Sequence, residues 1–241
     1  MNYVDAAQVT DEIYHTTEAV RRFVESYHLE NGSVLDIGSG RGQLQDLVAD
    51  YTGLDIAATA GRFYHKPFVP GTATALPFPD GRFDSAWSIN CMEHIPNPEQ
   101  AYREMRRVVK NGGLLYIAAA WNVPTWAAQG YDIRPYSDFG LGGKLIKLSV
   151  AVRSTRIYKY SYLVPIRFIR LLAQSGTTLH YTRLTPNYNA FYNDSDAVNS
   201  LDRYESVLWF TSRGDECLSC GGAFHGLLQR KNGALVIRVH K

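Results

Sequence analysis

A glycine-rich turn with an acid on either side is the first feature of the sequence that could do chemistry. The turn has the pattern Asp36-x-Gly38-x-Gly40-x-Gly42. Glycines between a strand and a helix let ligand atoms approach the backbone and leave amides free. Asp36 suits recognition of an aminoacyl group, and Asp55, at the end of the next strand, can accept both hydroxyl protons of a ribose. The alternatives are an ordinary tight turn and a solvated loop acid.

A nicotinamide dehydrogenase starts from a similar turn, but the spacing here departs from its pattern. In that pattern the third glycine falls three residues after the second. Gln43 occupies the corresponding position in this chain. A nicotinamide oxidoreductase is therefore a distant alternative for the function.

The elements that must position these residues follow from the hydrophobic pattern. We expect strands over residues 33–37, 51–56, 83–89, 114–118, 215–219 and 234–239. We expect helices over residues 11–25, 43–50 and 99–109, and one capped by Asp202 that ends near Gly214. Alternation of strands and helices predicts an α/β, Rossmann-like sheet that is mostly parallel, with helices on both faces.

A long stretch before the last helix interrupts this alternation. Unstructured loops of more than about 15 residues are unusual within a domain, so this stretch is expected to be a lid or an acceptor-binding insertion. We therefore predict one domain with four segments. These are an N-terminal helix or lid (1–32), a cofactor-binding core (33–121), the insertion (122–201), and the last helix and strands (202–241).

The insertion is strongly basic and rich in aromatic residues. The whole chain has a formal charge of +2, yet residues 139–193 hold eight lysines and arginines and no acid, which leaves −6 for the remainder. This asymmetry favours an anionic or glycan-like small-molecule acceptor, with nucleic acid a weaker alternative. Residues 144–152 and 163–172 also read as basic amphipathic helices that could contact an anionic membrane. A solvated basic face over an aromatic core is the simpler interpretation.

Composition suggests the compartment. No apolar run approaches the roughly 18 residues of a spanning helix, and the N-terminus lacks the order of a signal peptide. We expect a cytoplasmic protein, with peripheral contact at the inner membrane surface as an option.

Two small clusters of polar residues have simple interpretations. Cys217 and Cys220 form a CxxC that we interpret as incidental thiols. We interpret the acids at 194–202 as helix caps or as partners of the insertion's arginines. No metal site is expected.

Five ordered motifs together resemble a known enzyme family. They are residues 36–42, Asp55, 75–84 (ALPFPDGRFD), 92–96 (MEHIP) and 107–113 (RVVKNGG). This set is similar to the class I methyltransferases of the UbiE-like, methyltransferase type 11 group, over residues 34–118. The resemblance implies a seven-stranded sheet with an antiparallel last strand. It also implies S-adenosyl-L-methionine as the cofactor.

The resemblance also implies which residues would hold that cofactor. The methionine end would be lined by Asp36, Gly38, Ser39 and Gly40, with Asn90 nearby, while Asp55 and Ile56 would bind the ribose and cover the adenine. Where the family often has an acid before the small residue that faces adenine, this chain has Thr72 before Ala73. The Thr72 hydroxyl can still accept a hydrogen bond from the adenine amine. Tyr14 could reach over the cofactor as a lid residue, or simply pack in its helix.

His94 is the candidate catalytic base. Methyl transfer from a sulfonium is an in-line displacement, and alignment alone can contribute about 7 to 11 kcal/mol. A hydroxyl acceptor must also lose its proton, which suits a base with a pKa near neutrality. The alternative is that Glu93 and His94 only fix the loop that carries them.

The acceptor is the least determined part of the function. The insertion loosely resembles methyltransferases associated with bacterial surface polysaccharides, which favours O-methylation of a sugar, nucleotide-sugar or lipid-linked glycan. RNA, a lipid, a quinone or an amine are alternative acceptors. A cofactor-binding scaffold without turnover is an alternative of another class, and Thr72 favours it.

Overall fold

The computed structural model describes residues 11–173, 178–189, 194–221 and 233–241, without the side chains of residues 11–15. The chain divides into two compact units, which are treated separately below. The first consists of Met1–Ala119, Gly214–Ser219 and Ala234–Lys241, and the second of Ala120–Arg213 and Cys220–Gly233.

The first unit is built on a seven-stranded sheet with the strand order β3-β2-β1-β4-β5-β9-β8. The strands are β1 (Ser33–Ile37), β2 (Asp50–Asp55), β3 (Phe68–Pro70), β4 (Phe83–Ile89), β5 (Val109–Ala118), β8 (Glu216–Cys217) and β9 (Leu235–Arg238). β1 to β5 pair in parallel, whereas β9 is antiparallel to both β5 and β8. The predicted α/β fold and its antiparallel last strand are confirmed.

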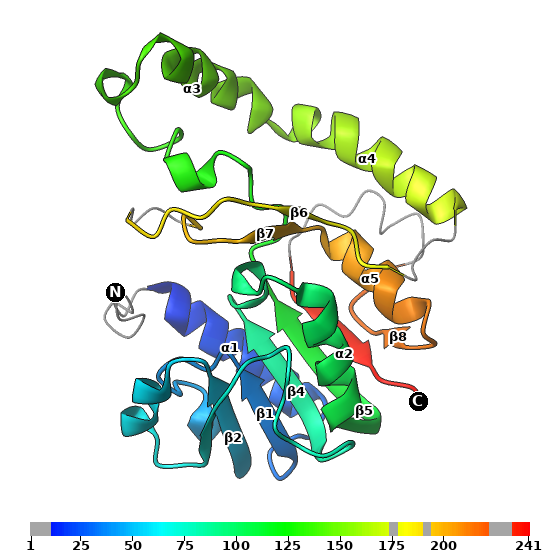
Figure 1. The fold of residues 1–241 in the computed structure, drawn as a ribbon. Coiled ribbons are helices and arrows are strands. Elements are labelled where there is room, and N and C mark those ends of the chain that lie inside the picture. Colours follow the sequence, from blue (N-terminus) through cyan, green and yellow to red (C-terminus); the bar gives the residue numbers. More distant parts are fainter. Residues whose placement is uncertain (1–10, 174–177, 190–193, 222–232) are drawn as a thin grey trace. The chain divides into compact units, whose positions relative to one another are not determined.

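Helices cover the central strands, which explains why those strands read as continuous apolar runs. Every residue of β1 is buried. α1 (Asp11–Ser26) packs Val20, Phe23 and Val24 into a cluster with Trp87 and Tyr116. α2 (Pro98–Val108) buries its own apolar stripe, and Figure 1 shows α1 and α2 on opposite sides of the strands. The sheet core therefore rigidly positions the loops at the strand ends.

Two local predictions in this unit were wrong. The expected helix over 43–50 is only a 3₁₀ turn at Gln45–Leu47, because β2 already begins at Asp50 and too few residues remain to repay helix nucleation. The expected strand over 215–219 is reduced to the two residues of β8. β3 was missed, because three residues ending in proline carry little strand pattern.

The second unit contains the predicted insertion together with the helix that follows it. Its elements are α3 (Leu141–Arg153), α4 (Arg156–Leu172), α5 (Arg203–Thr211), and the antiparallel pair β6 (Tyr181–Arg183) and β7 (Asn199–Leu201). α3 and α4 confirm the two expected helices and extend them, and α4 continues through Pro165. The Asp202 side chain accepts a hydrogen bond from the Tyr204 amide, as expected of a helix cap.

The cysteines differ from expectation. Cys217 and Cys220 are disulfide-bonded, so their interpretation as incidental thiols was wrong. Two intervening residues leave such a pair close enough for its sulfurs to meet. Cys91 keeps a free thiol.

None of the helices in the described part of the chain combines the length and the apolar character needed to cross a membrane.

Candidate functional site

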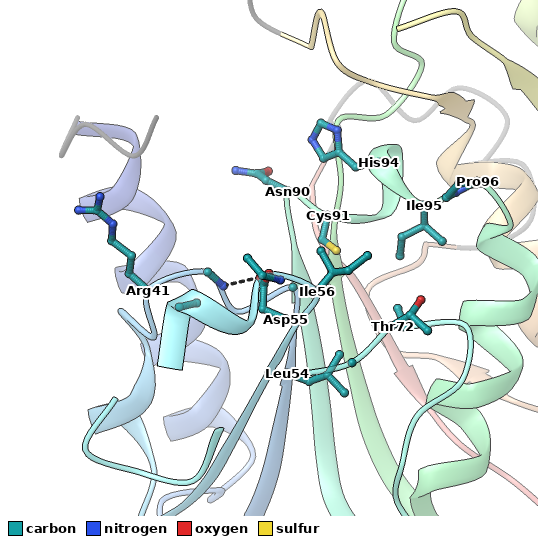
Figure 2. A pocket seen from close by; sticks show the side chains of 16 residues that line it. Arg41, Leu54, Asp55, Ile56, Thr72, Asn90, Cys91, His94, Ile95 and Pro96 are labelled. Atoms are coloured by element: carbon teal, nitrogen blue, oxygen red, sulfur yellow. Dashed lines mark hydrogen bonds between the residues drawn. The ribbon is translucent and has the colours of Figure 1, made fainter. Parts of the chain in front are cut away.

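A cavity opens where the strand order of the sheet reverses. β1 has β2 on one side and β4 on the other, and ligands of open parallel sheets bind at the carboxyl ends of strands at such a point. The cavity measures about 380 Å³, within the usual range for small-molecule sites. It is lined by the turn after β1, the end of β2, the turn after β3 and the loop after β4 (Figure 2).

The glycine turn needs glycine for two different reasons. Gly38 has φ +75°, and a Cβ there would lie 2.7 Å from the Cβ of Cys91 and overlap its sulfur. Gly40 has φ +51°, but a Cβ there would meet no atom within 4 Å. Gly38 therefore lets the β1 and β4 loops pack together, whereas Gly40 presents open backbone at the cavity.

Asp55 ties the end of β2 to the glycine turn. Its Oδ2 accepts a hydrogen bond from the Gly40 amide at 2.9 Å, drawn in Figure 2, and its Oδ1 accepts one from Ala57 at 2.8 Å. A carboxylate has about four acceptor positions, so it can accept further hydrogen bonds from a diol. The next residue, Ile56, lines the cavity with 79% of its surface exposed, a large apolar group available to cover a flat ring.

Asp36 and Ser39 lie close to the turn but do not line the cavity. Asp36 is buried, and its carboxylate accepts a hydrogen bond from the Tyr51 hydroxyl at 2.7 Å. The Ser39 hydroxyl accepts one from Tyr64 at 2.7 Å. Both residues hold the turn in place, and their direct contact with a ligand stays a prediction.

Tyr64 supports the turn, and the sequence interpretation missed it. A Cβ at Gly42 would lie 2.7 Å from its ring, and a Cβ at Gly53 would lie 2.5 Å from it. The ring also stacks on Tyr51 with 6.4 Å between centroids. Gly42 and Gly53 therefore make room for a protein side chain rather than for a ligand. A glycine inside a strand is the signal that could have revealed this close approach.

The buried carboxyl of Asp36 predicts a pH-dependent stability. Burial raises its pKa from 3.8 to about 6, so between these values the folded state binds a proton that the unfolded state has lost. The stability contributed by the protonated form is complete below pH 3.8 and is lost as the pH rises through 6. Relative to Asp36→Asn, the wild type should lose about 2 kcal/mol between pH 4 and pH 7. Urea unfolding of both proteins across this range tests this, and parallel profiles would contradict it.

Thr72 and Ala73 lie in the turn after β3 and line the cavity. The Thr72 hydroxyl is 3.0 Å from that of Thr74 and accepts a hydrogen bond from the Thr74 amide. It is therefore shared with its own turn, and its contact with adenine stays a prediction. Ala73 is buried, which keeps this wall narrow and apolar.

Asn90 and His94 line the cavity on the loop after β4 (Figure 2). Asn90 has φ +47°, and its backbone N–H donates a hydrogen bond to the Ala118 carbonyl at 2.7 Å. This bond fixes the loop at the end of β4. The His94 ring is partly exposed, and its Nε2 lies 3.8 Å from Oε1 of the buried Glu93. This arrangement suits a base at the mouth of the cavity, and it suits an ion pair that orients the loop. The side chain of Tyr14, the predicted lid residue, lies outside the described residues.

The structure also brings residues to the cavity that the sequence did not single out. Leu54, Ile95 and Pro96 form apolar walls, and Cys91 places its thiol among them. Burial, aided by the nearby Glu93 carboxylate, raises the pKa of Cys91 to about 12, so the thiol stays protonated and is a poor nucleophile. Apolar residue types alone give no sequence signal for such walls.

Comparison with known proteins finds a match in the core of this unit. A family model described as a methyltransferase domain matches residues 35–117, from β1 to β5. This part of the chain is therefore similar to a methyltransferase domain. The cofactor that the match indicates is S-adenosylmethionine, as predicted from the motifs.

The same part of the chain is similar to segments of known methyltransferases. The 2-methyl-6-phytyl-1,4-hydroquinone methyltransferase of Synechocystis sp. is 36% identical over 103 residues, which are 37% of this chain and 32% of that protein. The sterol 24-C-methyltransferase of Gibberella zeae is 37% identical over 100 residues, or 35% and 26% of the two chains. A solved S-adenosylmethionine-dependent methyltransferase from Aquifex aeolicus is 17% identical with a TM-score of 0.38, covering 43% and 64%. The chain thus spans about a third or less of the length of the first two relatives.

The cavity residues fit S-adenosylmethionine by their chemistry. Asp55 offers acceptor positions for the ribose hydroxyls, while Ile56 and Ala73 offer apolar surfaces for the adenine. The open backbone at Gly40 leaves room on the glycine turn for the methionine moiety. The cavity thus offers hydrogen-bond acceptors for the ribose, apolar surfaces for the adenine and space for the methionine moiety.

Proposed function

We propose that this chain transfers the methyl group of S-adenosylmethionine to a small-molecule acceptor that enters beside His94. The observation that carries the proposal is the cavity at the strand reversal, where Asp55 joins the end of β2 to the glycine turn within the segment that matches a methyltransferase domain. When bound, the cofactor supplies an electrophilic methyl group on a sulfonium. The protein's main tasks are then to align the acceptor and to exclude water.

The cavity residues divide these tasks. Asp55 and Ile56 hold the nucleoside end of the cofactor, and the apolar side chains of Leu54 and Ile95 keep water away from it. Asn90 lies just beyond the carboxyl end of β4, and His94 lies on the loop that follows. For a hydroxyl acceptor, the His94 ring takes the proton that the acceptor oxygen must lose.

The His94→Ala variant is expected to lose turnover while it keeps its affinity for the cofactor. Removing a general base lowers rates by about 10²- to 10⁴-fold, whereas the nucleoside contacts lie elsewhere in the cavity. Calorimetry gives the cofactor affinity, and single-turnover assays give the rate. An unchanged rate would assign His94 to the loop-orienting role beside Glu93.

The proposed acceptor is a hydroxyl of a sugar, a nucleotide-sugar or a lipid-linked glycan. A lipid or quinone acceptor is the second candidate, and the names of the two relatives favour it, because one methylates a phytyl hydroquinone and the other a sterol. Association with surface polysaccharides stays a prediction from the sequence.

Labelling with a deuterated cofactor tests the proposal. Extracts of the source organism, membranes included, are incubated with the protein and S-adenosylmethionine that carries a deuterated methyl group. We expect labelled glycan or lipid products with the wild type and none with Asp55→Ala. If the wild type binds the cofactor in calorimetry but no labelled product forms, the chain is a cofactor-binding scaffold and the proposal fails.

A further inference from the structure

The outer face of α3 is apolar, although it faces solvent. Leu141, Leu145, Leu148 and Val152 recur at intervals of four, three and four residues, which places them on one face of the helix. Each is between 61% and 84% exposed. Val150 lies on the opposite face and is buried. The apolar stripe of this helix therefore points away from the second unit.

The inner face of α3 is the polar one. The Lys147 ammonium donates a hydrogen bond to the Tyr131 carbonyl at 2.7 Å. The Arg153 guanidinium lies 4.3 Å from the centre of the Trp126 ring, within reach of a cation–π interaction. A surface helix of a globular protein normally places its polar side outward. In α3 this arrangement is inverted.

α4 shows the same inversion with stronger contacts. Arg167 binds both carboxylate oxygens of Asp202, at 2.7 and 2.6 Å, and Arg170 binds both of Glu205, each at 2.9 Å. These two arginines are therefore neutralised inside the second unit rather than presented to an anionic ligand. The expected pairing of the acid cluster with arginines of the insertion is confirmed for Asp202.

The outer face of α4 carries large apolar and aromatic side chains. At least two-fifths of the surface of each is exposed, and the set comprises Ile157, Tyr158, Tyr162, Ile166, Phe168, Ile169 and Leu172. In Figure 1, α3 and α4 follow one another along the same side of β6 and β7, within the second unit. Because the inner face of each helix contacts that unit, the two apolar faces both look away from it. Exposed apolar patches of this kind usually mark an interaction site.

Charge indicates what this surface contacts. Residues 139–193 contain no acid, and the exposed Lys144 adjoins the leucine stripe of α3. A second copy of the chain would meet this face without an acid to pair with Lys144, whereas anionic lipid headgroups would complement it. Tyrosines such as Tyr158 and Tyr162 favour the boundary between headgroups and acyl chains. Apolar, aromatic and cationic groups together match a helix that lies in the plane of a bilayer.

We propose that the outer face of α3 and α4 docks on an anionic lipid bilayer, with the leucines of α3 inserted among the acyl chains and Lys144 at the headgroups. This docking does not depend on methyl transfer. It would bring the second unit to the surface in which a lipid or lipid-linked molecule is dissolved.

Co-sedimentation of the full chain with vesicles tests the proposal. The vesicles are phosphatidylcholine alone or phosphatidylcholine mixed with phosphatidylglycerol. We expect binding to the mixed vesicles that weakens as salt rises, and much weaker binding to the neutral ones. The double variant Leu145→Glu with Leu148→Glu should bind the mixed vesicles at least about tenfold more weakly. The variant Lys144→Gln should lose affinity for the mixed vesicles only.

Control measurements distinguish lipid binding by this face from misfolding of the variants and from binding of a second copy of the chain. Ile133→Glu places one such charge on another exposed apolar position of the second unit and should leave vesicle binding unchanged. Circular dichroism and cofactor affinity confirm that each variant is folded. Failure of the wild type to bind mixed vesicles at low salt would overturn the proposal. So would a dimer in analytical ultracentrifugation that the leucine variant splits, because a second copy would then cover this face.

Discussion

The Asp55→Ala variant is expected to bind S-adenosylmethionine about 100-fold more weakly than the wild type. Asp55 lines the cavity and already holds the amides of Gly40 and Ala57. Two hydrogen bonds from ribose hydroxyls to a carboxylate contribute about 1.5 kcal/mol each at the lower end of their range, so their loss gives about 100-fold. Isothermal titration calorimetry with the cofactor and with its demethylated product measures the change.

Two further variants make this test specific. Asp55→Asn keeps one acceptor oxygen and should fall between the wild type and Asp55→Ala. Asp46→Ala removes a surface carboxylate that contacts His65 outside the cavity, and its affinity should equal that of the wild type. If Asp55→Ala binds the cofactor as tightly as Asp46→Ala does, the assignment of the ribose site is wrong.

The Arg167→Met variant is expected to destabilise the second unit by about 3 kcal/mol or more. Arg167 and Asp202 are both largely buried, and removing one partner leaves the other as an uncompensated charge. Asp202 also caps α5, so the change reaches two helices. Hydrogen exchange of the full chain, followed by mass spectrometry, should show amides of α4 and α5 exchanging about 100-fold faster.

Comparison variants identify the cause of that loss. Arg156→Met alters an exposed arginine at the start of α4 and should change stability by no more than about 0.5 kcal/mol. Arg167→Met combined with Asp202→Asn should recover part of the lost stability, because no isolated charge then remains buried. Equal exchange rates in Arg156→Met and Arg167→Met would contradict a structural role for the ion pair.

Patterns that are local in the chain were sufficient to predict the sheet and several of the residues that line the cavity. The alternation of buried strands with amphipathic helices predicted the α/β fold, because each strand and helix shows its period within its own residues. Gly40, Asp55 and Ile56 line the cavity, and their contacts with the cofactor stay predictions. Both strands that carry them run in parallel, so their carboxyl ends must meet at one edge of the sheet.

Contacts between distant residues decided the rest. The sequence of residues 43–50 does not reveal that β2 begins early enough to leave only a 3₁₀ turn. The glycines at 42 and 53 do not reveal that they make room for the Tyr64 ring, because that residue is distant in the chain. The sequence of α4 contains a basic face and an apolar face, but its own residues do not determine which one is covered. Asp202 and Glu205 each lie 35 residues after the arginine that they bind, and these ion pairs bury the basic face. A periodic pattern defines the faces of a helix, whereas only the tertiary structure supplies the partner that buries one of them.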